Sequence, residues 1–382
     1  MKKRRLIQLL VIGLVMSMLF AGCPRTESVN EEIKIGVVAP FDGSNAHIGQ
    51  LIMNSVELYF SQHQVANVPI KIIPIDTKSN PANATAALQS AIADSKLKAI
   101  IGFYHSSTAS ACKTIIQESK IPTLIYSASN PEVTSNAPYY FRLVPTDDNQ
   151  SIVLADYAKQ LGASRIGILY YADEYGKGLM DGVKQHSKEI GLDVVDIQSY
   201  DSSTNDFRPI LTVMKGKQPE IIMICGFVEK SIAIINQAAE KGLKATFLCG
   251  DGTFNEQQLI QGTGKNSEGV YVAAPYVFDE TNARNRVFLE SYWKKYDISD
   301  NPQKPASWTV FAYDAAGIIS HAIGDGKKER ASITEYLQKM TSADFAYNGI
   351  TGPIFFNENG DVEGRTFRLA VVKNQQFNAL AN

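Results

Sequence analysis

The sequence predicts an α/β protein built as two doubly wound parallel-sheet lobes around a ligand cleft. Short apolar, β-branched runs alternate with segments of helical spacing, which is typical of a parallel sheet with helices on both faces. This series runs from residue 33 and starts again at residue 165. The chain has 382 residues. Since a typical domain has about 150 residues, two lobes are the default expectation.

The first series of elements lies between residues 33 and 126. Its strands read as continuous apolar runs without polar alternation, so we expect them to be buried on both faces. The expected strands are 33–40, 70–76, 99–104 and 123–126. The expected helices are 46–63, 81–94 and 108–119. Ser106 and Ser107 are candidate N-caps of the last of these helices.

The second series repeats the same alternation. Its expected strands are 165–171, 193–197, 220–225, 246–249 and 270–275, and its expected helices are 174–190, 206–215, 229–241, 282–296 and 308–323. In the tail, segments 352–357 and 366–373 are expected to form antiparallel strands around an Asn-Gly turn at 359–360. No Ser/Gly-rich linker separates the two series, so the lobes should face each other across a cleft. Ligands of open α/β sheets bind at the carboxyl ends of strands.

The N-terminus has the pattern of an export signal. Residues 2–5 read Lys-Lys-Arg-Arg, and an apolar run of 17 residues from Leu6 to Gly22 precedes Cys23. A basic region, a short apolar core and small residues at the end are typical of a secretory signal. As a helix the run would be roughly 25 Å long, short of a bilayer core of about 30 Å, so we do not expect a permanent span.

The end of this signal resembles a bacterial lipobox, in which cleavage before a cysteine leaves that cysteine lipid-modified. Phe20 stands where the lipobox usually has Leu, three positions before Cys23. We expect residues 1–22 to be a lipoprotein signal peptide, Cys23 to be lipidated, and residues 23–32 to be a polar tether. The mature chain would then be exported, periplasmic or at the cell surface, and anchored to a membrane through Cys23. An ordinary signal with an incidental cysteine is the alternative.

The charge balance argues against nucleic acid as the main ligand. The chain has 37 Lys and Arg against 39 Asp and Glu, and removal of residues 1–22 takes away four positive charges and no negative ones. The mature chain therefore carries 33 against 39, a net charge of −6. It has no basic excess to neutralise a phosphate backbone. Four cysteines are too few for a disulfide scaffold, and Cys225 and Cys249 could form a disulfide or remain free thiols.

Common catalytic constellations are absent from the sequence. It contains no P-loop motif, no GxGxxG after a strand and no GxSxG elbow. The five histidines, at 47, 63, 105, 186 and 321, show no metal-ligand spacing. Ser106 beside His105 is a hint of a hydrolase, against the ordinary role of a serine at a helix start. We therefore expect no enzyme, no cofactor and no metal.

Polar residues follow the strands at the expected cleft. Ser106 lies between a strand and a helix start, where free N–H groups and a hydroxyl can hold a carboxylate, with plain capping as the alternative. The next strand is followed by more hydroxyls, at 127 and 129. Asp251 lies between two glycines after a strand of the second lobe, where it could pair with an ammonium or be a turn aspartate. Together with the aromatic residues at 104, 175 and 227, these features describe a site for a free amino acid.

The chain resembles the periplasmic leucine/isoleucine/valine-binding protein family, the substrate-binding components of ABC amino-acid importers with the type I periplasmic binding protein fold. The likeness covers roughly residues 32–375. It rests on short segments at strand ends, namely 33–40 with Gly43 and Gly49, 102–107, 127–131, 175–178 and 250–252.

The resemblance implies roles for individual residues. The carboxylate-binding serine corresponds to Ser106, the ammonium-binding carbonyl and hydroxyl to Ser127 and Ser129, the ammonium-pairing acid to Asp251, and a cross-cleft tyrosine to Tyr175. The sequence departs from the family at several positions. Ile48 and Phe227 stand where the family has tyrosines, and Asp251 stands where it has the longer Glu. The small disulfide common near the cleft is missing, because its positions are His105 and a segment around Ser79 without Cys. The complete set of candidate ligand-binding residues is Ile48, Tyr104, Ser106, Ser127, Ala128, Ser129, Tyr175, Phe227 and Asp251.

The resemblance also implies a domain organisation and a function. The lobes should exchange chain near residues 147, 275 and 347, so that lobe one comprises 33–147 and 276–346, and lobe two comprises 148–275 and 347–382. The implied function is that of a monomeric, extracytoplasmic solute-binding protein of an ABC importer, which binds a branched-chain or other apolar amino acid between two closing lobes and delivers it to a permease. The alternative is a receptor-type sensor or binding protein for amides, aromatic acids or another small carboxylate.

Overall fold

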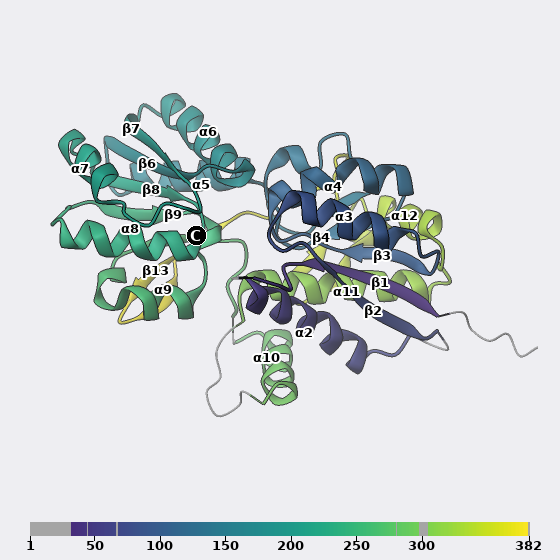
Figure 1. Cartoon of the computed structure of the whole chain (residues 1–382). Coiled ribbons are helices and arrows are strands. Elements are labelled where there is room, and N and C mark those ends of the chain that lie inside the picture. The colour runs from purple at the N-terminus through teal and green to yellow at the C-terminus, as the bar shows by residue number, and fades with distance from the viewer. Residues whose placement is uncertain (1–31, 44, 66–67, 280, 298–304, 381–382) are drawn as a thin grey trace, which may run out of the picture.

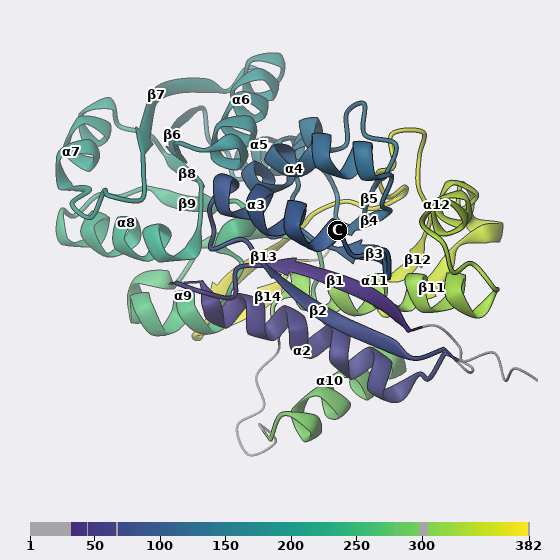
Figure 2. The ribbon, with the colours of Figure 1, turned by 45° about the vertical axis from the view of Figure 1, so that its right-hand side comes forward.

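The computed structural model describes residues 32–43, 45–65, 68–279, 281–297 and 305–380. The predicted signal peptide, the predicted lipidation site Cys23 and all of the predicted tether except Glu32 lie outside the described residues. Within these ranges no helix combines the length and the apolar character that crossing a bilayer requires. Figures 1 and 2 show two α/β bodies side by side, which we call lobe one and lobe two.

Lobe one is built on a five-stranded sheet in the order β2-β1-β3-β4-β5, and all neighbours in it are parallel. Its strands are β1 (Ile33–Ala39), β2 (Ile70–Asp76), β3 (Leu97–Ile101), β4 (Thr123–Ile125) and β5 (Tyr140–Arg142). Every side chain of β1 except Lys34 is buried. This agrees with the continuous apolar run in the sequence, because a central parallel strand is covered on both faces.

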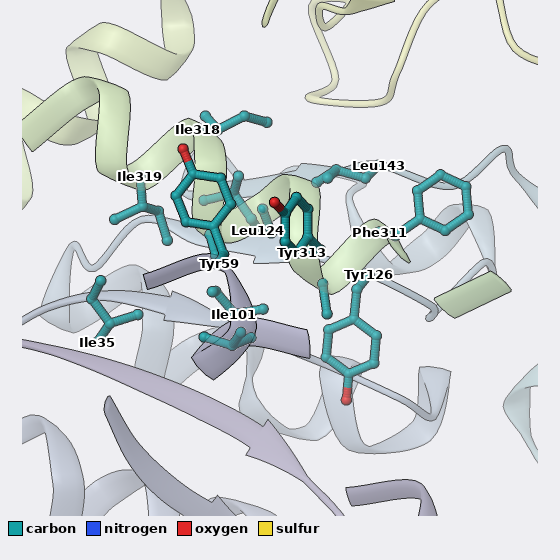
Figure 3. Close-up of a cluster of buried hydrophobic side chains, with 14 of the residues drawn as sticks. Ile35, Tyr59, Ile101, Leu124, Tyr126, Leu143, Phe311, Tyr313, Ile318 and Ile319 are labelled. Carbon is teal, nitrogen blue, oxygen red and sulfur yellow. The ribbon is translucent and has the colours of Figure 1, made fainter. Parts of the chain in front are cut away.

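Helices cover both faces of this sheet. One face packs against α3 (Pro81–Ile92) and α4 (Ser106–Ser119) through residues such as Val38 and Cys112. The other face packs against α2 (Ala46–Gln62) and α11 (Ser307–Gly324), and Figure 3 shows Tyr59, Phe311 and Ile319 in this second core. Two further helices contribute to the same core, α10 (Ala283–Lys295) and α12 (Arg330–Gln338).

Lobe two is built on a seven-stranded sheet in the order β14-β13-β10-β9-β8-β6-β7. The parallel strands are β6 (Arg165–Tyr171), β7 (Asp193–Tyr200), β8 (Ile221–Cys225), β9 (Thr246–Cys249) and β10 (Tyr271–Ala274). The antiparallel edge strands are β13 (Arg368–Lys373) and β14 (Gln376–Ala379). Helices α5 (Asp147–Gln160) and α6 (Glu174–Glu189) cover one face, and α7 (Arg208–Lys217), α8 (Val228–Glu240) and α9 (Glu256–Thr263) cover the other.

The predicted fold class is confirmed, but the predicted hairpin in the tail is wrong. The Asn-Gly turn is present, with Gly360 at a φ of 79°, and Phe356 and Val362 form an antiparallel bridge across it. Segment 366–373, however, does not pair with segment 352–357. Instead β12 (Gly352–Ile354) pairs with β11 (Tyr347–Gly349) next to α11, while β13 extends the sheet of lobe two. Local turn chemistry predicted the turn but could not show that the chain leaves for the sheet of lobe two before the second predicted strand.

The segment after residue 347 also belongs to a different lobe than expected. Side chains of Ile354, Phe356 and Val362 lie in the core of lobe one, whereas Leu369 and Val372 of β13 lie in the cores on the two faces of the lobe-two sheet. An ion pair between Arg142 and Asp361 ties this segment to the end of β5, with 2.7 Å between Nη2 and Oδ1. The chain therefore passes into lobe two between Val362 and Leu369, later than the expected residue 347.

Cys225 and Cys249 are both free thiols in the interior of lobe two. Cys225 lies in the core beneath α5 and α6, whereas Cys249 lies in the core beneath α7, α8 and α9. The two side chains point to opposite faces of the sheet, because Cys249 pairs in register with Ile224 and not with Cys225. A disulfide between them is therefore geometrically excluded in this fold.

Candidate functional site

A cavity lies between the two lobes at the carboxyl ends of their strands, and it encloses about 600 Å³ of empty space including its open mouth. Lobe one and the connecting segments contribute Tyr104, His105, Ser106, Tyr126, Ser127, Ser129, Val144, Pro275, Ser307 and Trp308. Lobe two contributes Tyr175, Phe227, Val228, Asp251, Gly252, Phe254, Asn255 and Gln258. Seven of the nine candidate residues thus line one cavity, since the carboxyl ends of parallel strands meet at one edge of each sheet.

Ser106 lies at the start of α4, where β3 ends. It is the first helical residue, and His105 occupies the N-cap position without a side-chain capping bond, so the predicted capping by Ser106 or Ser107 is wrong. The Ser106 hydroxyl instead accepts a hydrogen bond from the Asn130 N–H at 3.3 Å. The first N–H groups of a helix have no acceptor within it. This helix start can therefore donate to an anion placed in the cavity.

The segment after β4 presents two hydroxyls to the cavity, from Ser127 and Ser129. Ala128 between them is buried against the core of lobe one and does not line the cavity. Its carbonyl accepts a hydrogen bond from the guanidinium of Arg142 at 3.3 Å. Ser127 and Ser129 reach the cavity, whereas the side chain of Ala128 is buried in the core and does not contact it.

Asp251 begins a short 3-10 helix, η2 (Asp251–Thr253), directly after β9. Its Oδ1 accepts hydrogen bonds from the Tyr175 hydroxyl at 2.8 Å and from Nε2 of Gln150 at 2.9 Å. Burial raises the pKa of Asp251, while these two hydrogen bonds act in the opposite direction. Gly250 allows this close packing, because a Cβ there would lie 2.6 Å from the Tyr175 hydroxyl. The geometry holds a carboxylate at the lobe-two wall of the cavity.

Aromatic rings form much of the remaining wall. Phe227 packs against Tyr175 within lobe two, with 5.3 Å between ring centroids, and against His105 across the cleft, also at 5.3 Å. In lobe one, Tyr104 lies edge-on to Trp308 at 5.7 Å. Such edge-to-face contacts are favourable beyond simple burial. The wall therefore suits an apolar or aromatic group of a ligand.

Ile48 does not line the cavity. Its side chain is 3% exposed and lies in the core of lobe one beneath α2. The family resemblance placed it at a ligand-contacting position of the first loop, but the residue falls within α2, where the helix turns its side chain toward the sheet. The structure therefore does not bring Ile48 together with the other candidate residues.

Direct hydrogen bonds also join the lobes near the cavity. Nδ2 of Asn130 donates to the carbonyl of Glu174 at 2.8 Å, and the Ser110 hydroxyl donates to the Glu174 carboxylate. At the other side of the mouth, Nε2 of Gln258 lies 3.1 Å from Nε2 of His47. The structure thus has the two lobes in contact across the cavity.

Sequence reasoning missed several residues of the site. Trp308 and Tyr126 line the cavity, and Gln150 holds Asp251 from behind. Trp308 comes 204 positions after Tyr104, so no local spacing connects the two. Gln150 offered a weak signal, because it follows the acidic residue Asp147 by three positions on the same helix face.

The geometry around Ser106 does not match a hydrolytic pair. The neighbouring imidazole of His105 has no hydrogen-bond partner at Nδ1, and burial lowers the pKa of His105 to about 4. The Ser106 hydroxyl is instead engaged with the backbone of residue 130. Across the described ranges, no group of three or more His, Cys, Asp or Glu side chains could hold a metal ion.

Residues 32–376 match the sequence profile of the periplasmic binding protein family. The chain belongs to this family. It is 25% identical over 359 residues to the Leu/Ile/Val-binding protein of Escherichia coli (strain K12), which covers 91% of this chain and 94% of that protein. The predicted family resemblance is therefore confirmed.

Two solved structures have the same fold as the chain. The leucine-binding protein LivK from Thermotoga maritima has a TM-score of 0.83 at 28% identity and covers 91% of this chain and 98% of its own. A solute-binding protein of an ABC transporter from R. palustris, in complex with 4-hydroxybenzoate, has a TM-score of 0.82 at 21% identity. The match covers 92% of this chain and 96% of that chain. The family consists of extracytoplasmic solute-binding proteins and not of enzymes, and this member is a substrate-binding protein of the ABC-transporter type related to branched-chain amino-acid binders.

Proposed function

We propose that this protein binds a free amino acid, branched-chain or otherwise apolar, between its two lobes and delivers it to an ABC permease. One observation carries the proposal, namely that Ser106, Ser127 and Ser129 of lobe one line the same cavity as Asp251 of lobe two. The start of α4 and the Ser106 hydroxyl would hold the ligand carboxylate. Asp251 would pair with the ammonium, which the Ser127 carbonyl and the Ser129 hydroxyl would also contact. The aromatic walls would contact the side chain.

The proposed mechanism is a two-lobe clamp. The ligand docks on the hydroxyls of lobe one, and lobe two then closes, which brings Tyr175, Phe227 and Asp251 over it. Contacts that exist only in the closed state shift the population toward that state. The contacts of Glu174 with Ser110 and Asn130 support this proposal, because they join the two lobes directly beside the cavity. The permease would recognise the closed arrangement.

The relatives support an amino acid as the ligand. The E. coli protein is named for leucine, isoleucine and valine, and the T. maritima protein for leucine. Phe227 and Trp308 line the cavity and can contact an apolar side chain of the ligand. We therefore propose the class of apolar amino acids without assigning one member of it.

A matched pair of ligands tests the proposal. The ligand-free mature chain is titrated by calorimetry with L-leucine and with 4-methylpentanoate, which has the same carboxylate and side chain but no amine. L-phenylalanine and 3-phenylpropanoate form a second pair. We expect the amino acid of at least one pair to bind at least about 30-fold more tightly, since the loss of a buried charge pair costs about 2 kcal/mol or more. Equal affinity within both pairs would refute the role of the ammonium.

A second candidate function is the binding of an aromatic acid without an amine. The ring-rich wall formed by Tyr104, Tyr126, Phe227 and Trp308 favours it, as does the R. palustris protein with 4-hydroxybenzoate. In this alternative, 4-hydroxybenzoate binds more tightly than any amino acid, and Asp251→Asn leaves its affinity unchanged. A titration of both ligands against both proteins separates the two functions.

We also propose that the chain is exported, lipidated at Cys23 and monomeric. The proposal rests on the basic residues 2–5, the apolar run and the lipobox-like ending. In cells, the wild type should fractionate with membranes and carry acyl groups on Cys23 in mass spectrometry, whereas Cys23→Ser should be released. Light scattering of the mature chain should give the mass of one copy. A Cys23→Ser variant that stays with the membrane would refute the anchor.

A further inference from the structure

Two buried carboxylates behind the cavity are held by one amide. Nε2 of Gln150 donates to Oδ1 of Asp147 and to Oδ1 of Asp251, at 2.9 Å each. The Oε1 of the same side chain accepts a hydrogen bond from the backbone N–H of Asp251 at 2.8 Å. Gln150 is completely buried, so its orientation is set by these three bonds. The amide therefore keeps the two acids close together, and it donates a hydrogen bond to only one carboxylate oxygen of each.

Asp147 is the deeper of the two acids. It is 2% exposed, and its Oδ2 has no hydrogen-bond partner among the described residues. Its N–H donates to the carbonyl of Ser129 at 2.9 Å. Asp251 and Ser129 line the cavity, whereas Asp147 does not. Asp147 thus lies directly behind the two residues to which we assign the ammonium, and a buried carboxylate oxygen without a partner is costly unless a positive charge or a proton compensates it.

The protein itself supplies little compensation. The ionisable groups that act on the pair are Asp148 on the same helix, Tyr175 on α6, Cys225 on β8, Tyr104 after β3 and Arg142 on β5. Arg142 is the cation of this set, and it is already bound to Asp361 at 2.7 Å. Asp148 adds a further negative charge. The surroundings therefore favour uptake of a proton by the pair.

Electrostatics support the same conclusion. Burial raises the pKa of Asp147 well above its usual value and the charge of Asp251 raises it further, whereas the Ser129 hydroxyl and the charge of Arg142 act in the opposite direction. Burial also raises the pKa of Asp251. Two acids that share a buried site do not ionise together readily, so they titrate as a pair and hold one proton over a range of pH.

We propose that the site exchanges this proton for the ammonium group of its ligand, so that amino-acid binding releases one proton from the Asp147–Asp251 pair to solvent. The inference rests on the proposed binding of an amino acid. The charges balance, because the pair carries −1 with its proton, and after binding it carries −2 beside an ammonium of +1. Asp147 is a positioning residue in this scheme, since it acts through Gln150 and Asp251 and does not contact the ligand.

The direction of the pH dependence follows from this exchange. The ammonium stabilises the doubly ionised pair, so the bound state has the lower pKa for the shared proton. Affinity therefore rises with pH between the lowered pKa of the complex and the raised pKa of the free protein. For one proton the rise is at most about tenfold per pH unit. A site without exchange would show no such rise while the ligand stays zwitterionic.

Calorimetry in paired buffers measures the released proton directly. The mature chain is titrated with L-leucine, L-isoleucine, L-valine and L-phenylalanine in phosphate and in Tris at the same pH, and again from about pH 5 to about pH 8. The difference in binding heat between buffers, divided by the difference in their ionisation enthalpies, gives the number of protons released. We expect this number to rise toward one at some pH in the range, with a parallel gain in affinity.

Two neighbouring variants test the assignment to Asp147. In Asp147→Asn the amide can still accept from Gln150, so we expect binding to persist while proton release falls below about half of the wild-type value. Asp148→Asn removes the exposed charge of the next residue on the same helix, so we expect the pH range of proton release to shift slightly downward while the maximum number of protons released stays the same. Thermal melting shows whether each variant folds. If Asp147→Asn does not fold, the wild-type titration still tests whether amino-acid binding releases a proton.

The possible failures differ from one another. If an amino acid binds with no proton release at any pH, the exchange is refuted and the proposed function stands. If Asp147→Asn folds and releases as many protons as the wild type, the assignment to this pair is refuted. If none of the four amino acids binds, the proposed function fails, and the inference fails with it.

Discussion

The two walls of the cavity differ in charge. The lobe-one wall presents neutral groups, with Ser106, Ser127 and Ser129 beside the start of α4. The lobe-two wall presents the carboxylate of Asp251, which is bound by Tyr175 and Gln150. The first wall is complete without a ligand, since neutral hydroxyls and N–H groups can be hydrated at little cost. The lobe-two wall keeps a negative charge near another buried acid, so a bound cation stabilises this wall more than the lobe-one wall.

This difference indicates how the two lobes divide the work of binding. The neutral groups of lobe one can donate hydrogen bonds to the carboxylate of an incoming ligand while the two lobes are still open. The charged wall of lobe two stabilises the closed state, because an ion pair is far stronger where water is excluded than where it is present. We therefore expect changes in lobe two to affect affinity more than changes in the hydroxyls of lobe one. Three predictions test this comparison.

The largest effect should come from Arg142, which holds the lobe-one wall in place. Its side chain is fully buried and bonds to Asp361, Thr134 and the carbonyl of Asn130. Arg142→Met leaves Asp361 without its partner, so we expect the free energy of unfolding to fall by about 3–5 kcal/mol. Urea denaturation measures this loss. The exposed Arg208, replaced in the same way, should change stability by less than about 1 kcal/mol, as for surface ion pairs in general.

The next effect should come from the charge of the lobe-two wall. Asp251→Asn keeps the shape of the side chain but removes the charge, so we expect amino-acid affinity to fall by about 30-fold to a few thousand-fold, equivalent to about 2–5 kcal/mol. Calorimetry with the amino acid that binds the wild type measures the loss. Asp181→Asn changes an exposed aspartate of α6 and serves as the control. A loss smaller than that caused by Ser106→Ala would reverse our comparison of the two walls.

The smallest effect should come from a single hydroxyl of lobe one. Ser106→Ala removes one neutral hydrogen-bonding group while the N–H groups of α4 remain, so we expect affinity to fall by roughly tenfold, about 1–1.5 kcal/mol. The neighbouring Ser107 does not line the cavity, and Ser107→Ala should leave affinity unchanged. The same titration measures both variants. An unchanged affinity in Ser106→Ala would place the carboxylate elsewhere.

Local sequence patterns predict the position of the cleft and every parallel strand of the described sheets except β5, which has only three residues and no apolar run. Strands 70–76, 165–171 and 246–249 have the same bounds in the structure as in the prediction. Buried parallel strands are continuous apolar runs, so their signal is local and strong. The polar residues that follow such strands must meet at one edge of the sheet. For this reason the sequence alone predicts that Ser106, Tyr175 and Asp251 share one cavity.

Packing between distant segments determines which lobe the tail joins and which side chains face the cavity. The Asn-Gly turn at 359–360 predicted a hairpin, but the core of lobe one takes up Phe356 and Val362 before the chain reaches β13. Ile48 and Ala128, two candidate ligand contacts, turn into the core instead. Trp308 and Gln150 reach the site from helices that carry little or no local signal of it. These outcomes depend on contacts between residues that are far apart in the chain, and local spacing carries no information about such contacts.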